Sequence, residues 1–179
     1  VVGTSSGAIS ATNAAVRLTG TAAPDGLVVT SPVTSGNPDA YKPWVRQSVF
    51  SNDLDNIKIP VLVVVHTEDK CIRTPPVLGA RIIRKTNGAR EQAVAVTGGA
   101  GRVGDESVKA CKGRSPHGFI GQEEEVAAGI ARFTVVARIK RYDLRHCRPV
   151  IGGNRGRLFV ITLNFDQRGL RDAALCQLR

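Results

Sequence analysis

The strongest constraint on the fold is a serine flanked by glycines at the start of the chain. Gly3, Ser5 and Gly7 follow the pattern G-x-S-x-G, and small and apolar residues typical of a helix come directly after them. In this pattern a strand ends in a sharp turn, the serine occupies the strained tip and a helix begins. We expect both glycines to be required because a side chain there would strike the neighbouring strand or helix. This nucleophile elbow predicts an exposed, reactive hydroxyl on Ser5.

Strands and helices are predicted to alternate along the next part of the chain. The run 61–65 is continuously apolar, which is typical of a parallel strand covered on both faces. Thr74 precedes two prolines and is the expected N-cap of the helix that follows. This order predicts an α/β fold, a three-layer αβα sandwich around a mostly parallel sheet. The predicted strands are 26–31, 57–66 and 91–97, and the predicted helices are 8–18, 75–85 and 122–135.

The charge of the chain is distributed unevenly. The net charge is +10, but residues 136–179 hold ten Lys and Arg against three Asp and Glu, while residues 1–135 hold fifteen against twelve. We therefore expect one folded domain over 1–135, with a mixed surface, followed by an Arg-rich basic tail over 136–179. The chain has no Met and starts inside a predicted strand, so we expect a fragment that lacks the first strands of its sheet. We expect no membrane span and see no signal peptide.

An acid and a base for Ser5 are expected at the ends of later strands. Asp69 follows the strand 57–66, and His117 follows a long loop after the strand 91–97. The carboxyl ends of parallel strands collect functional groups at one edge of a sheet. His117 would take the Ser5 proton and later return it, and Asp69 would hold the imidazole in the required tautomer. The backbone N–H of Ser6 would stabilise the oxyanion.

Other residues compete for these roles. Glu68 is a rival acid, but the shorter side chain of Asp69 at the strand end fits the role better. His66 comes before the acid in the chain and is expected to be a packed or rim histidine. His146 lies in the basic tail.

With these residues assigned, the segment 1–135 resembles the C-terminal half of an α/β-hydrolase of the serine-hydrolase type. The resemblance is carried by the elbow, by the run 59–66 leading to Asp69 and by the pair His117-Gly118. It is strongest with the esterase, dienelactone-hydrolase and peptidase-like branch. The resemblance implies a truncated α/β-hydrolase fold that cleaves a small-molecule ester, thioester, lactone or amide through an acyl-serine intermediate. It implies no cofactor. The family's N-terminal half, which would supply the second oxyanion donor, is missing, so both an active and an inactive fragment stay open as expectations.

The cysteines suggest a covalent link between two of the loops. None of the four is in a C-x-x-C pair, so we expect no metal site. Cys71 closely follows Asp69, and Cys111 shortly precedes His117, so a disulfide would tie the acid loop to the histidine loop. Two unrelated thiols are the alternative. A bridge would indicate a periplasmic or secreted protein, and its absence a cytoplasmic one.

Two other parts of the sequence suggest alternative functions. The glycine-rich segment 97–104 follows a strand, as the NAD(P)-binding turn of a Rossmann-type protein does, but residues 105–113 are too charged and short for the apolar helix that this turn needs. The tail 136–179 would suit a non-catalytic basic module that binds nucleic acid, yet it contains no known module and few aromatic residues. We prefer the hypothesis that the tail is not native to the domain. Its apolar stretch 158–163 is a possible strand without a clear partner.

Overall fold

The computed structural model describes all residues except 38, 89, 100–103, 140–158, 167–168 and 178–179. It divides the chain into two compact units, Val1–Thr134 and Val135–Arg179. In the part of the chain that the structure describes, no helix combines the length and the apolar character needed to cross a membrane.

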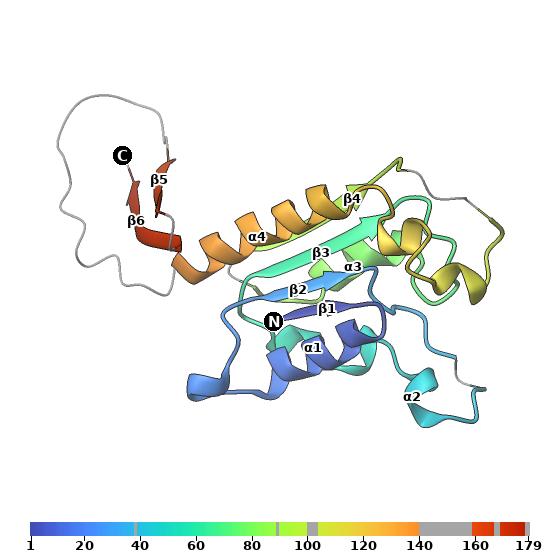
Figure 1. Cartoon of the computed structure of the whole chain (residues 1–179). Helices are drawn as coiled ribbons and strands as arrows, with labels where there is room; N and C mark the ends of the chain where they lie inside the picture. The colour runs from blue at the N-terminus through green and yellow to red at the C-terminus, as the bar shows by residue number, and fades with distance from the viewer. Residues whose placement is uncertain (38, 89, 100–103, 140–158, 167–168, 178–179) are drawn as a thin grey trace. The chain divides into compact units, whose positions relative to one another are not determined.

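The first unit is built on a sheet of four parallel strands, in the spatial order β1-β2-β3-β4 (Figure 1). Every residue of β2 is buried, as is all of β3 except Val65, which is half-buried. The expectation of a parallel strand covered on both faces is therefore confirmed. The strands are β1 (Val2–Thr4), β2 (Leu27–Thr30), β3 (Val61–His66) and β4 (Glu91–Val96).

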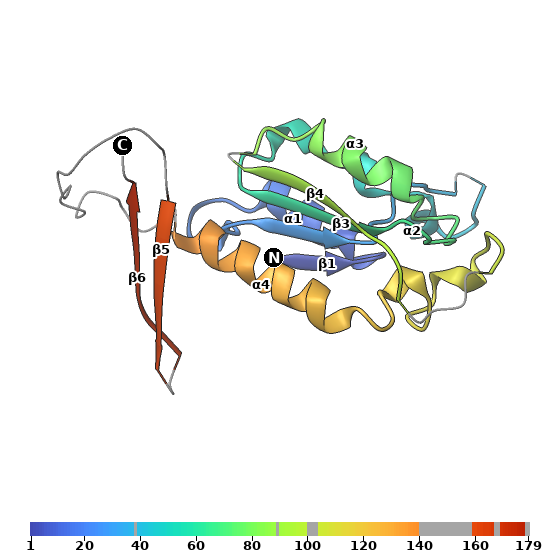
Figure 2. The same cartoon turned by 90° about the horizontal axis from the view of Figure 1, so that it is seen from above.

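Helices cover both faces of this sheet. The helices α1 (Gly7–Arg17) and α3 (Gly79–Ile83) lie on one face, and α4, which begins at Glu123, lies on the other (Figures 1 and 2). The predicted α/β architecture with three layers is confirmed. The helix α4 has the bounds Glu123–Ile139, and a short helix, α2 (Pro43–Arg46), lies in the long connection after β2.

The core lies between the sheet and the pair α1 and α3. Ala8 and Ala11 are small enough to let α1 approach β2 closely, and Ile82 brings α3 onto the same surface. Burial of large aliphatic side chains is worth about 1.5–3 kcal/mol each, so this cluster supplies the main stabilisation of the sheet. Its members are Ala8, Ala11, Leu27, Val29, Val49, Leu54, Ile57, Val61, Val63 and Ile82.

Two of the predicted boundaries were wrong. The strand predicted over 57–66 begins only at Val61, because Pro60 has no N–H to donate and the chain before it forms a 3-10 turn, η3 (Leu54–Asn56). The helix predicted over 75–85 is a 3-10 turn, η4 (Pro76–Leu78), followed by the short helix α3.

The second unit contains an antiparallel hairpin of β5 (Phe159–Asp166) and β6 (Gly169–Gln177). The first of these strands was expected from the apolar stretch 158–163, and its partner was not. The register pairs Val160 with Cys176. Strand β6 mixes apolar, charged and small residues, so its own pattern gave no strand signal.

The two glycines of the elbow differ in what they must accommodate. A Cβ atom on Gly3 would lie 2.5 Å from the carbonyl oxygen of Gly7 and 2.7 Å from the Cβ of Ala11. A Cβ atom on Gly7 would meet nothing within 4 Å. The expectation that a side chain would clash is therefore correct for Gly3 and wrong for Gly7.

Gly3→Ala is predicted to lower the free energy of unfolding by about 1–3 kcal/mol, because the backbone of α1 must move away from β1. Gly7→Ala is the matched control and is expected to leave stability unchanged or raise it by up to about 1 kcal/mol, since alanine is favoured in a helix. Urea unfolding followed by circular dichroism measures both values. Equal stability of the two variants would contradict the close approach of α1 to β1.

Candidate active site

Ser5 lies at the tip of the turn between β1 and α1. It adopts the left-handed backbone conformation, with a φ of 52°, which is unusual for a residue other than glycine. The surrounding backbone holds this conformation: the Ser5 N–H donates to the Thr30 carbonyl at 3.0 Å, and the Ala8 N–H donates to the Ser5 carbonyl at 3.1 Å. The turn thus has the strained geometry that the elbow pattern predicts, and the Ser5 side chain remains partly exposed.

Asp69 lies in the loop after β3 and is 5% exposed. One carboxylate oxygen, Oδ1, accepts the backbone N–H of Cys71 at 2.8 Å, and the other, Oδ2, accepts the hydroxyl of Thr74 at 2.7 Å. The predicted N-cap role of Thr74 was therefore wrong. Pro75 is the N-cap residue of η4, and the Thr74 hydroxyl is directed to the carboxylate instead.

His117 lies in a 3-10 turn, η6 (Pro116–Gly118), which Ser115 caps by accepting the His117 N–H. The residue is 3% exposed. Its Nδ1 lies 2.9 Å from Asp69 Oδ2, and its Nε2 lies 3.1 Å from Ser5 Oγ. The structure thus brings together the three side chains selected from the sequence, although 112 residues separate Ser5 from His117.

Ser31, just past the end of β2, binds the backbone of the histidine loop. It follows β2, has a φ of 39° and is 1% exposed. Its hydroxyl donates to the carbonyl oxygen of His117 at 2.8 Å. Nothing in the sequence singled out Ser31, because a serine after an apolar strand is typical of many loops.

The rival residues lie elsewhere or make other contacts. The backbone N–H of Glu68 donates to His66 Nδ1, so the proton of that ring is on Nε2, which lies 2.9 Å from the Gly98 carbonyl. His66 is 1% exposed and is a packed histidine, as expected. Within the described residues, the backbone N–H of Ser6 donates to no other group. His146 lies outside the described residues.

A disulfide joins Cys71 to Cys111, with a Cα–Cα distance of 4.5 Å. It connects the acid loop to the segment that leads to His117, and the Ser107 N–H adds a bond to the Lys70 carbonyl at 3.0 Å. The bridge, one of the two alternatives left open by the sequence, is therefore present. Cys71 Sγ lies close to the Asp69 and His117 side chains, but a disulfide sulfur carries no thiolate charge and is no metal ligand.

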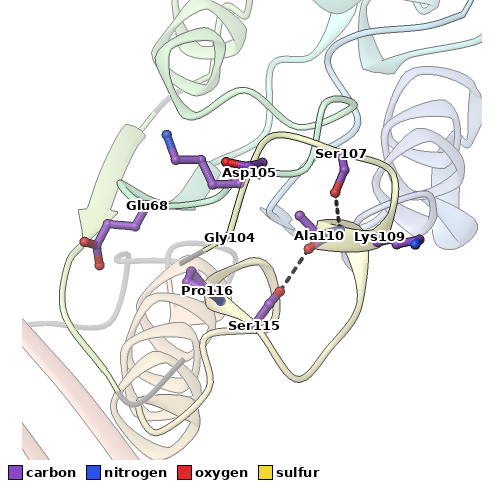
Figure 3. Close-up of a pocket in the computed structure, with 9 residues that line it drawn as sticks. Glu68, Gly104, Asp105, Ser107, Lys109, Ala110, Ser115 and Pro116 are labelled. Atoms are coloured by element: carbon purple, nitrogen blue, oxygen red, sulfur yellow. Dashed lines mark hydrogen bonds between the residues drawn. The ribbon is translucent and has the colours of Figure 1, made fainter. Parts of the chain in front are cut away.

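A cavity of about 410 Å³ lies where the acid loop meets the histidine loop (Figure 3). Glu68 and Pro116, the chain neighbours of Asp69 and His117, contribute to its wall, but none of the three clustered side chains does. Its lining carries charges of both signs. The lining residues are Glu68, Lys70, Gly104, Asp105, Ser107, Lys109, Ala110, Ser115 and Pro116.

The two alternative functions depend on other parts of the chain. A Rossmann-type turn requires a helix directly after the glycines. Residues 104–122, all of which are described, contain only the 3-10 turns η5 (Lys109–Cys111) and η6. The nucleic-acid alternative rests on the basic tail, and residues 140–158 of that tail lie outside the described residues.

Comparison with known proteins adds information on the fold. No protein-family model matches the chain, and no curated protein matches its sequence. Among solved structures, the chain is similar to the crystal structure of Paleococcus ferrophilus monoacylglycerol lipase, with a TM-score of 0.50 and 18% sequence identity over 76% of this chain and 67% of that chain. This likeness supports a hydrolase-like α/β fold and distinguishes no branch of the α/β-hydrolases.

The disulfide is predicted to stabilise the first unit by restricting the unfolded chain. For a separation of 40 residues, loop-closure entropy predicts a loss of about 2–4 kcal/mol when Cys71 and Cys111 are both replaced by serine. Urea unfolding with and without reductant measures this loss. The double variant is its own control, because its unfolding midpoint should no longer respond to reductant. A wild-type midpoint that is insensitive to reductant would contradict the prediction.

Proposed function

We propose that the chain is the catalytic part of a serine hydrolase that cleaves an ester, thioester, lactone or amide bond of a small molecule. The observation that carries the proposal is the continuous series of polar contacts from Ser5 Oγ to His117 Nε2 at 3.1 Å and from His117 Nδ1 to Asp69 Oδ2 at 2.9 Å. A hydroxyl, an imidazole and a carboxylate in this order make up the proton-transfer system of serine hydrolases.

In the proposed reaction, Ser5 Oγ attacks the carbonyl carbon of the substrate and its proton passes to His117 Nε2. The backbone N–H of Ser6 donates to the negatively charged oxygen that forms. When this intermediate collapses, the bond to the leaving group breaks, and the leaving group takes the proton from Nε2. Water then attacks the acyl-serine, and the proton it loses to Nε2 returns to Ser5 as the acid is released.

The burial of the acid and the base supports these roles. The side chains of His117 and Asp69 are 4% and 1% exposed, so water competes little for their contact. Asp69 would fix the imidazole with its proton on Nδ1 and stabilise the imidazolium during each transfer. Ser5, by contrast, is partly exposed, as an attacking group must be.

The proposal assigns this activity to residues 1–135, and the basic tail 136–179 takes no part in the reaction. It also places the protein in an oxidising compartment, because disulfides such as Cys71–Cys111 form and persist there. The disulfide supports a periplasmic or secreted location, which we propose for the protein.

Labelling with a fluorophosphonate tests the proposed nucleophile. The full chain is predicted to be labelled at Ser5, and Ser5→Ala to abolish the labelling, because the reagent bonds to the activated hydroxyl oxygen. In complete serine hydrolases, loss of this serine lowers kcat on the order of a millionfold, so hydrolysis of p-nitrophenyl esters should fall to background.

Ser10→Ala is the matched control, since Ser10 is an exposed serine on α1. It should keep both labelling and esterase activity. Labelling of Ser5→Ala at the wild-type level, or an unlabelled wild-type protein without esterase activity, would contradict the proposed function.

A further inference from the structure

Thr74 makes two contacts inside the cluster of Ser5, His117 and Asp69. Its hydroxyl donates to Asp69 Oδ2 at 2.7 Å and lies 3.1 Å from His117 Nδ1. Thr74 is 2% exposed, so both contacts are shielded from water. It therefore touches the acid and the base at the point where they meet.

The direction of the Thr74 hydroxyl proton determines the tautomer of His117. A threonine hydroxyl has one proton, and here that proton is directed to the Asp69 carboxylate. The Thr74 oxygen can therefore only accept a hydrogen bond from His117 Nδ1. Because the carboxylate is also an acceptor, both neighbours of Nδ1 require a proton on that nitrogen. Nε2 is then left with a free lone pair directed to the Ser5 hydroxyl.

We propose that Thr74 is a positioning residue of the hydrolytic site, which orients the Asp69 carboxylate and selects the His117 tautomer with its proton on Nδ1. This inference rests on the proposed function of Ser5, His117 and Asp69. Thr74 itself touches no reacting atom and acts through the two side chains that it contacts.

The backbone around Thr74 makes the hydroxyl well suited to this role. The Thr74 N–H donates to the Cys71 carbonyl at 3.0 Å, which closes the acid loop. Pro75 follows, and a proline disfavours the helical conformation for the residue before it. A β-branched side chain has few χ1 rotamers, so the hydroxyl of Thr74 has little freedom to turn away from the carboxylate.

The carboxylate has few other donors that would replace this hydroxyl. Asp69 Oδ1 is held by the Cys71 N–H, while Oδ2 has the Thr74 hydroxyl and His117 Nδ1. Without the hydroxyl, only the imidazole would hold Oδ2, and a buried charge would lose one of its three partners. Rotation of the carboxylate away from His117 would then become easier.

Three variants of the full chain distinguish a positioning role of Thr74 from a general effect on the stability of the fold. Thr74→Val removes the hydroxyl with little change in shape, and Thr74→Ser keeps the hydroxyl. Thr86→Val is the matched control, since the Thr86 hydroxyl also donates to a carboxylate oxygen at 2.7 Å, that of Glu91, which is likewise five residues away.

Steady-state hydrolysis of p-nitrophenyl esters is the first measurement. Thr74→Val should lower kcat by about 10- to 100-fold with KM nearly unchanged, because a hydrogen bond to a buried charge is lost at the proton-transfer group and not at the substrate. Thr74→Ser should restore most of kcat. Thr86→Val should keep the wild-type kcat although its stability falls.

Nitrogen-15 NMR of the His117 imidazole is the second measurement, and it requires no activity. The wild-type protein and Thr74→Ser should show a protonated Nδ1, whereas Thr74→Val should show an increased share of the other tautomer. A wild-type kcat and an unchanged tautomer in folded Thr74→Val would overturn the inference while Ser5 remains the nucleophile. If Ser5→Ala keeps full activity, the proposed function itself is wrong and the inference falls with it.

Discussion

The contact between the His117 imidazole and the Asp69 carboxylate is the interaction on which the candidate site depends. A carboxylate whose side chain is 1% exposed needs hydrogen bonds from the protein in place of those from water. It receives them from the Cys71 backbone, the Thr74 hydroxyl and His117. The same bonds determine where the imidazole lies and hence where its second nitrogen meets Ser5.

The sheet and the covalent link hold the loops in the positions that this contact needs. Ser5 and Ser31 follow the adjacent strands β1 and β2, and both have positive φ angles. Ser5 presents its hydroxyl to the His117 imidazole, and the Ser31 hydroxyl donates to the carbonyl of His117. The Cys71–Cys111 disulfide connects the two remaining loops. Strained backbone of this kind persists only where the surrounding structure supports it, as it does at this edge of the sheet.

Much of the fold was predictable because its signals are local. The apolar run of β3 and the G-x-S-x-G turn each depend on neighbours in the chain, and both were identified correctly. The failures concern contacts that the pattern of a single segment does not specify. Strand β6 was missed because it is defined by its pairing with β5. Thr74 was expected to cap a helix because two prolines follow it, and this expectation failed because the Asp69 carboxylate takes its hydroxyl.

By itself, the sequence determined the chemical groups and their order: a serine in a glycine-flanked turn, an acid after a buried strand and a histidine after a long loop. Only the tertiary structure decided which atoms meet. The distance from Nε2 to Ser5 Oγ and the bond from Ser31 to His117 join residues on different loops, and the Thr74 hydroxyl meets the carboxylate only because the acid loop turns back on itself. Such contacts depend on the packing of parallel strands, whose carboxyl ends meet at one edge, and no periodicity along the chain encodes them.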